Sequence, residues 1–177
     1  MALSKYELDR SHSTVGFTAR HLMVSKVHGT FETWDGSVEL DLDDLTRSKV
    51  SAQIDVASIQ THEEKRDAHL RSADFFDVEH FPKLTFTSKR IEKKGEGDYR
   101  MVGDLTMHGV TREVALDTEF LGTQKDPWGG ERVGFSASAK VPRKDWGLGW
   151  NMALEAGGLL VSENIEIHLD VEAKKAS

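Results

Sequence analysis

Cysteine is absent from the 177-residue chain, proline occurs only three times, and no apolar run is long enough to cross a bilayer as a helix. The absence of thiols excludes disulfides and thiolate sites, whether catalytic or metal-binding. The first ten residues, MALSKYELDR, lack the apolar core of a secretory signal. We therefore expect a cytoplasmic protein without stable membrane insertion.

Positive charge is scarce as well. Lys and Arg number 23 against 30 Asp and Glu, which gives a formal net charge of −7. An acidic chain without a clustered basic patch is a poor partner for nucleic acid, so no such partner is expected. The length suits one domain with a sizeable core, and we therefore expect residues 1–177 to form a single domain.

Motifs for catalysis and metal binding are also missing. The sequence HEEKR at 62–66 begins like the helix of a zinc protease, but Arg66 stands where the second histidine ligand is required. There is no Gly-x-Ser-x-Gly nucleophile elbow. Gly95 and Gly97 lack the third glycine of a phosphate-binding loop. The sequence therefore predicts no catalytic residues, no metal site and no cofactor, and hence a protein that is not an enzyme.

What the chain does contain is alternation of apolar and polar residues with the period of two that β-strands show. Residues 15–21 and 133–141 are clear examples. About eight to ten such segments follow one another at regular spacing. Turns are predicted at 35–36, 95–98 and 126–130. The pattern is typical of an antiparallel sandwich or barrel with one dry and one wet face.

Residues 67–82 interrupt the β pattern. Thr61, with Glu64 three residues later, predicts a capping box and a short helix over about 63–70. Pro82 ends the segment because it has no N–H to donate to a helix. The sequence thus predicts one helical insertion within an otherwise all-β chain.

Three apolar side chains of the insertion, Leu70, Phe75 and Phe76, need an apolar surface, and only the strands can supply one. Two interpretations stay open. The segment either caps one end of the β-structure or is a connector that packs on the outside of a sheet.

The dry faces of the strands mix large and small side chains. Small residues such as Ala19, Ala52, Ala137 and Ala139 either leave volume for a ligand or fill a taper opposite larger residues. A cavity would suit an aliphatic ligand, because each buried CH₂ contributes about 0.8 kcal/mol. The predicted pocket lining consists of Phe17, Ala19, His21, Phe31, Ile54, Leu70, Phe75, Phe76, Phe86, Phe135 and Ala137.

His21 stands at the end of a dry face and would therefore lie at the mouth of such a cavity. Together with Arg20 and Arg143 it is a candidate to bind the head group of a ligand. The alternatives are a histidine satisfied by a backbone carbonyl and two ordinary exposed bases.

Several segments resemble those of the YceI-like family, whose members are also described as lipocalin-like polyisoprenoid-binding proteins. The resemblance runs from about Tyr6 to the last strand. It is carried by DRSHS at 9–13, Phe17, His21, GTF at 29–31, DAHLRSADFFDVEHFPKLTFTS at 67–88, GDLTMHGVT at 103–111, GF at 134–135 and RKDWGL at 143–148.

The resemblance implies an extended antiparallel eight-stranded lipocalin-like barrel around a long apolar pocket. It implies a bound isoprenoid lipid, isoprenoid quinone or fatty-acid derivative. It also implies a homodimer, for which Trp34 and Trp128 near turns could serve as anchors. Many members are periplasmic, whereas this N-terminus predicts a cytoplasmic location.

These observations predict a non-enzymatic carrier or store of a long-chain isoprenoid-type lipid. One alternative is an enzyme or accessory factor that acts on a lipid or quinone in the same pocket. The other is an interaction module whose barrel is filled and holds no ligand.

Overall fold

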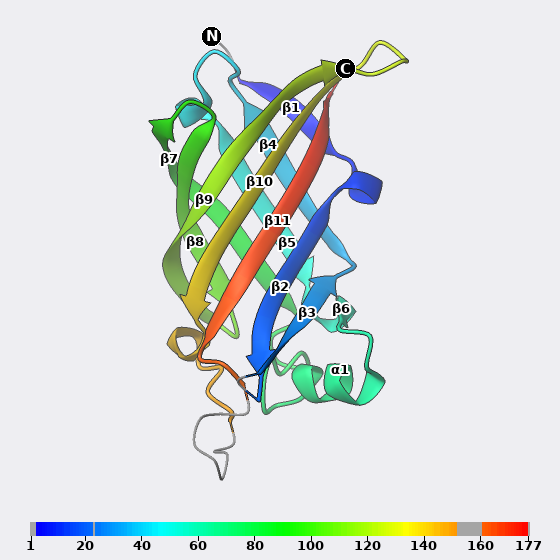
Figure 1. The fold of residues 1–177 in the computed structure, drawn as a ribbon, viewed down its shortest axis with the longest axis vertical. Helices are drawn as coiled ribbons and strands as arrows, with labels where there is room; N and C mark the ends of the chain where they lie inside the picture. Colours follow the sequence, from blue (N-terminus) through cyan, green and yellow to red (C-terminus); the bar gives the residue numbers. More distant parts are fainter. Residues whose placement is uncertain (1–2, 23, 152–160, 177) are drawn as a thin grey trace.

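The computed structural model describes residues 3–22, 24–151 and 161–176 (Figure 1). The strands are β1 (Ser4–Leu8), β2 (Thr14–His21), β3 (Ser25–Phe31), β4 (Trp34–Leu40), β5 (Lys49–Asp55), β6 (Ile59–Gln60), β7 (Lys83–Gly95), β8 (Asp98–Met107), β9 (Val110–Lys125), β10 (Glu131–Pro142) and β11 (Asn164–Lys175). The α-helix is α1 (Glu64–Arg71), and short 3-10 turns are η1 (Arg10–His12), η2 (Leu45–Arg47), η3 (Val56–Ser58) and η4 (Arg143–Trp146).

The sheet closes on itself because β1 pairs with β4 on one side and with β11 on the other. The closed ring runs β1-β4-β5-β7-β8-β9-β10-β11, and each of its pairings is antiparallel. Strands β2, β3 and β6 extend from the lower half of β11. Closure removes the free edges that an open sheet would present. The predicted eight-stranded antiparallel barrel with one short helix is confirmed.

The two ends of the barrel are built differently. The end that carries β1 and both chain termini is called the upper end, as drawn in Figure 1, and the end that carries α1 is the lower end. A small buried cluster fills the upper end and is called the upper cluster; it contains Tyr6, Val38, Leu40, Val133 and Ala173. A larger lower cluster gathers inward residues from most strands together with Trp146 and Leu148.

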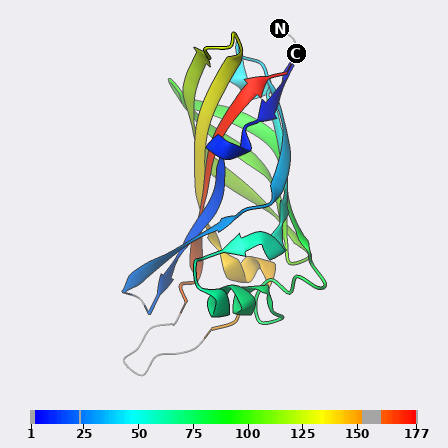
Figure 2. The ribbon, with the colours of Figure 1, turned by 90° about the vertical axis from the view of Figure 1, so that its right-hand side faces the viewer.

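Helix α1 lies across the lower end, as Figures 1 and 2 show. The predicted helix is confirmed, but the predicted capping box is wrong. The N-cap is Glu63, whose carboxylate accepts hydrogen bonds from the backbone N–H groups of Lys65 and Arg66. Thr61 is unavailable as a cap because its hydroxyl donates to the buried carboxylate of Asp67 at 2.5 Å. No helix among the described residues is long and apolar enough to span a membrane.

Two further expectations are corrected by the packing of β4. Asp35 and Gly36 lie inside this strand and do not form the predicted hairpin turn. Glycine at position 36 has a different reason, since a Cβ there would lie 2.9 Å from the backbone carbonyl oxygen of Ser51 on β5. Trp34 is only 8% exposed and packs in the lower cluster, so it cannot anchor an interface.

Candidate functional site: an apolar cavity in the lower half of the barrel

The lower half of the barrel encloses a cavity. Its volume is about 170 Å³ when measured as the space open to the centre of a water molecule, within about 1230 Å³ of space free of atoms that includes the opening to solvent. The smaller figure lies below the roughly 300–1,000 Å³ typical of ligand pockets, and the larger figure, which includes space open to solvent, lies above that range. The cavity lies between strands of the barrel wall and the segment that covers the lower end.

The lining is apolar with one exception. The described residues that line it are Val15, Gly16, Phe17, Ala19, Phe31, Val50, Ala52, Ile54, Leu70, Phe75, Phe76, Leu84, Phe86, Met101, Leu105, Met107, Val114, Leu116, Val141, Arg143, Leu148, Val161, Ile165, Ile167 and Leu169. Arg143 is the one member of this set with a polar side chain. The wall therefore offers hydrocarbon contact over nearly its whole surface.

Most of the predicted pocket residues lie where the alternation of the strands places them. Those that line the cavity are Phe17, Ala19, Phe31, Ile54, Leu70, Phe75, Phe76 and Phe86, and Arg143 lines it as well. Gly103 leaves room for the ring of Phe86, because a Cβ at position 103 would lie 2.5 Å from that ring. Ligand contact by these residues stays a prediction.

The structure does not place Phe135, Ala137, His21 or Arg20 in the cavity lining. Phe135 packs against the upper cluster, and Ala137 is buried within the packed part of the lower cluster. Residue parity on a strand sets the direction of a side chain but not its height along the barrel, which explains both corrections.

His21 and Arg20 lie at the lower tip of β2, beyond the cavity wall. His21 pairs with Ser25 across the hairpin to β3 and forms a bridge with Val161. The backbone N–H of Arg20 donates to the Ser162 hydroxyl, and Arg20 itself is exposed. The extension of β2 past the cavity wall therefore carries both side chains away from the lining.

The insertion that follows β6 is a cap and not an external connector. Phe75 packs against Trp150 and His69, with ring centroids 5.2 and 5.1 Å apart. Phe76 meets Phe31 of β3 edge-on at 6.1 Å. Because Leu70 and both phenylalanines face the cavity, residues 70–76 form one wall of it.

Arg143 begins η4 at the lower end of β10 and is only 3% exposed. Its Nε donates to the Ser162 carbonyl at 2.9 Å, and its Nη1 donates to the carbonyls of Leu148 and Trp150. Its guanidinium also lies 5.9 Å from the ring centre of Phe75. Burial lowers the pKa of Arg143 from its usual value, and the nearby negative charge of Glu163 partly opposes this shift.

Sequence reasoning missed many lining residues on β8, β9 and β11. The signal was present for Ile165, Ile167 and Leu169, which alternate strictly with polar neighbours. Leu148 and Val161 had no such signal, because they lie outside the strands.

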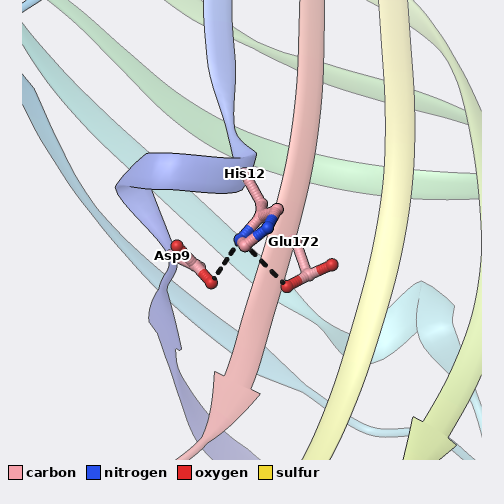
Figure 3. Close-up of side chains that lie close together, drawn as sticks. All are labelled: Asp9, His12 and Glu172. Carbon is pink, nitrogen blue, oxygen red and sulfur yellow. Dashed lines mark hydrogen bonds and ion pairs between the residues drawn. The ribbon is translucent and has the colours of Figure 1, made fainter. Parts of the chain in front are cut away.

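A cluster of charged groups lies on the outside of the upper end (Figure 3). His12 Nδ1 is 2.9 Å from Asp9 Oδ2 and 3.7 Å from Glu172 Oε2, a grouping that could hold a metal ion by geometry. Arg132 already supplies positive charge there, since its Nη1 lies 2.7 and 2.8 Å from the same two carboxylates. Hydrogen bonds from Ser11 and His12 hold the pKa of Asp9 well below its usual range, and Asp9 raises the pKa of His12. The arrangement is a network of ion pairs that joins η1, β10 and β11.

A closed antiparallel barrel with an apolar hollow under a short cap is the kind of β-barrel that can hold one small hydrophobic ligand. The chain belongs to the YceI-like family, because the model of the YceI-like domain matches residues 6–173. A UPF0312 protein of Staphylococcus epidermidis is 41% identical over 171 residues, covering 96% of this chain and 97% of the relative. A UPF0312 protein of Photorhabdus laumondii is 44% identical over 142 residues, covering 80% and 73%.

Solved structures show the same architecture. A YCEI protein of Campylobacter jejuni superposes with a TM-score of 0.78 at 31% identity, over 89% of this chain and 90% of that chain. BcnA of Burkholderia cenocepacia gives a TM-score of 0.83 at 19% identity, over 94% and 99%. A polyisoprenoid binding domain from Saccharophagus degradans gives 0.68 at 17%, over 99% and 100%. At these last two identities the likeness concerns the fold alone.

Proposed function

We propose that the protein binds a long-chain isoprenoid-type lipid, such as a polyisoprenoid, an isoprenoid quinone or a fatty-acid derivative, in the lower cavity and stores or carries it without changing it chemically. The observation that carries the proposal is a cavity whose described lining is apolar except for Arg143. The description of the Saccharophagus neighbour as a polyisoprenoid binding domain supports the same class of ligand.

The energetics favour a hydrocarbon chain. Each CH₂ group that leaves water for an apolar wall contributes about 0.8 kcal/mol, so a tail of several carbons is held without polar recognition. Three aromatic side chains of the lining, Phe17 and Phe86 on the strands and Phe76 on the cap, would contact such a tail. Because the apolar cavity is already formed in the folded protein, binding does not carry the entropy cost of ordering a loop.

Catalysis in the same cavity is the weaker alternative. A general acid or base needs a pKa near the working pH, and a guanidinium stays protonated at any such pH. Among the described lining residues, Arg143 alone is ionisable. A filled barrel is also disfavoured, because space free of atoms remains between the cap and the strands.

Extraction of the purified protein with organic solvent, followed by mass spectrometry, tests the proposal. We expect a long-chain lipid in near-stoichiometric amount, and we expect the delipidated protein to take up a fluorescent prenyl probe. Bovine serum albumin and a heat-denatured sample serve as controls for non-specific uptake. Absence of both an extracted lipid and probe uptake by the native protein would contradict the proposal.

A homodimer stays a prediction. Trp128, in the β9–β10 turn, is 81% exposed and remains the candidate anchor, with exposed Leu121 on β9. Large exposed aromatics are enriched at protein interfaces. Light scattering of the native protein should give twice the monomer mass, and Trp128→Ser should lower it. A monomer mass for the native protein at high concentration would remove the prediction.

A further inference from the structure

We propose that the cavity accepts a lipid with an anionic head group, a carboxylate or a phosphate, and that Arg143 binds this head group at the lower end of the barrel. The inference rests on the proposed function, because it specifies the ligand of the same cavity. It goes beyond lipid binding by assigning the charge of the ligand, its orientation and the residue that recognises it.

The hydrogen bonds of Arg143 leave part of its guanidinium free. A guanidinium has five N–H donors, one on Nε and two on each Nη atom. The carbonyls of Ser162, Leu148 and Trp150 take the donors of Nε and Nη1. Nη2 is buried and has no hydrogen-bond partner among the residues that the structure describes. Three fixed contacts therefore orient the group, and the two unpaired donors of Nη2 belong to a residue that lines the cavity.

The charge of Arg143 is not matched by a carboxylate. Within the described residues no acid lies at ion-pair distance from it, although fixed carbonyl dipoles partly offset its charge. Glu163 acts only through its field, since its exposed carboxylate is paired with Lys144 Nζ at 3.1 Å. A buried charge without a counter-charge is costly, and a guanidinium cannot lose its proton to avoid that cost. An anion in the cavity would therefore be stabilised more than a neutral acceptor of the same size.

The position of Arg143 also sets the direction of the ligand. The guanidinium lies at the lower end, near Phe75 of the cap, and the rest of the described lining is hydrocarbon. A tail would extend upward to Val50 and Met101, which also line a small pocket of about 40 Å³ nearer the upper cluster. The charged end would thus lie next to the cap at the lower end, and the tail would extend upward within the barrel.

A purely architectural role for Arg143 makes a different prediction. Its three carbonyl contacts join η4 to Leu148 and Trp150 and to Ser162, two residues before β11, and they could exist only to hold these segments together. In that case the protein would not distinguish ligands that share a tail and differ only in the charge of the head. Head-group selectivity therefore separates recognition from architecture.

The first experiment uses the native protein and two pairs of probes with matched tails. cis-Parinaric acid is compared with its methyl ester, and geranylgeranyl monophosphate with geranylgeraniol, by direct or competitive fluorescence titration. We expect the charged member of at least one pair to bind at least about tenfold more tightly, which is the order that one charge-assisted hydrogen bond contributes. The pair with the larger ratio identifies carboxylate or phosphate as the preferred head. Equal affinities within both pairs would overturn this inference and leave the proposed function intact, whereas no binding of any probe would contradict the proposed function itself.

The second experiment assigns the selectivity to Arg143. In Arg143→Met the ratio should fall to about one, and Arg143→Lys should keep part of it, with circular dichroism and thermal unfolding to verify the fold. Arg20→Met is the matched control, because it removes an exposed positive charge at the same end of the barrel. Full selectivity in folded Arg143→Met, or its loss in Arg20→Met, would overturn the assignment.

A third measurement uses the native protein, so the carbonyl contacts of Arg143 stay intact. Native protein labelled with ¹⁵N-arginine should show a perturbed Arg143 side-chain resonance when the charged probe is added. The neutral partner at the same occupancy should perturb it less. Identical spectra with both probes would contradict head-group contact by Arg143.

Discussion

The upper and lower ends of the barrel share most of their strands but differ in how tightly they are packed. At the upper end, β1 pairs on both sides, and the upper cluster inside it is almost wholly buried. At the lower end the inward residues surround a cavity. Figure 2 shows η4 and the cap across this end of the barrel. One end is packed and contributes stability, and the other retains space for a ligand.

Side-chain size and strand pairing explain the difference. Small residues, Gly16, Ala19 and Ala52, face the lower hollow, whereas Tyr6 and Leu40 fill the upper end. The upper ring is completed by strand pairing. The lower end is completed by the cap, because β6 has only two residues and pairs with β3 alone among the described strands. Because the cap is not hydrogen-bonded into the sheet as a strand, it can stand away from the barrel wall and leave space inside.

The largest expected effect is the loss of ligand binding when the cavity is filled. Ala52→Phe should abolish uptake of a prenyl probe, because the new ring enters space that a ligand tail would occupy. The melting temperature should change little. If the hollow did not exist, the same substitution would overpack the core and cost about 1–3 kcal/mol.

Ala115→Phe is the matched control for this test, since Ala115 points outward from β9 and is exposed. It should leave both binding and stability unchanged. Normal probe uptake by folded Ala52→Phe would show that ligand binds elsewhere.

A second pair of variants compares the packed and the hollow end directly. Leu40 and Leu84 are equally buried, but Leu40 belongs to the upper cluster and Leu84 lines the cavity. Leu40→Ala should lower the free energy of unfolding by about 2–5 kcal/mol and change probe affinity less than Leu84→Ala does. Leu84→Ala should lower probe affinity and destabilise less, because the space beside it is already empty. Urea unfolding and fluorescence titration measure the two quantities, and the reverse assignment of effects would refute the division between the ends.

The third prediction concerns the cap. Replacing Phe75 and Phe76 by Ser removes two apolar contacts of the cap with the barrel, each of order 1.5–3 kcal/mol. The release rate of a bound probe should therefore rise roughly tenfold or more, while the circular dichroism spectrum stays native. Phe81→Ser is the control, since Phe81 packs against His108 and does not line the cavity. Unchanged release from the double variant would mean that ligand leaves by another route.

The smallest expected effect is the pH dependence of the ion-pair network at the upper end. The pKa of His12 is raised in the folded state by Asp9, so protonated His12 stabilises the fold. This contribution is fully present below the unfolded pKa of about 6.5 and is lost as the pH rises through the higher folded value. The stability difference between native protein and His12→Asn should therefore shrink as the pH rises above about 6.5.

His80→Asn is a suitable comparison for that experiment, because Asp77 raises the pKa of His80 near the cap and not at the upper end. Both histidines are largely exposed, so the effects should be small. A difference for His12→Asn that grows with pH would contradict the assignment.

Local patterns in the chain predicted much of the fold. The alternation along β2, β10 and β11 identified strands, and the turns at 95–98 and 126–130 lie where glycine and aspartate occur together. Asp35 and Gly36 misled because glycine serves two purposes: it permits a tight turn, and it permits close packing of a neighbouring chain. The structure decides between them, because a Cβ at position 36 would lie 2.9 Å from the backbone carbonyl oxygen of Ser51 on the neighbouring strand.

By itself the sequence determined which residues face inward, that a short helix follows β6, and that one family accounts for nearly the whole chain. These properties depend on nearest-neighbour alternation and on motifs a few residues long. The tertiary structure alone decided how high each inward residue sits, so that Phe17 lines the cavity and Phe135 does not. It also decided that Arg143, and not His21 or Arg20, is buried at the lining, because the path of the chain after β10 turns that guanidinium under the barrel while the β2–β3 hairpin carries the other two past it.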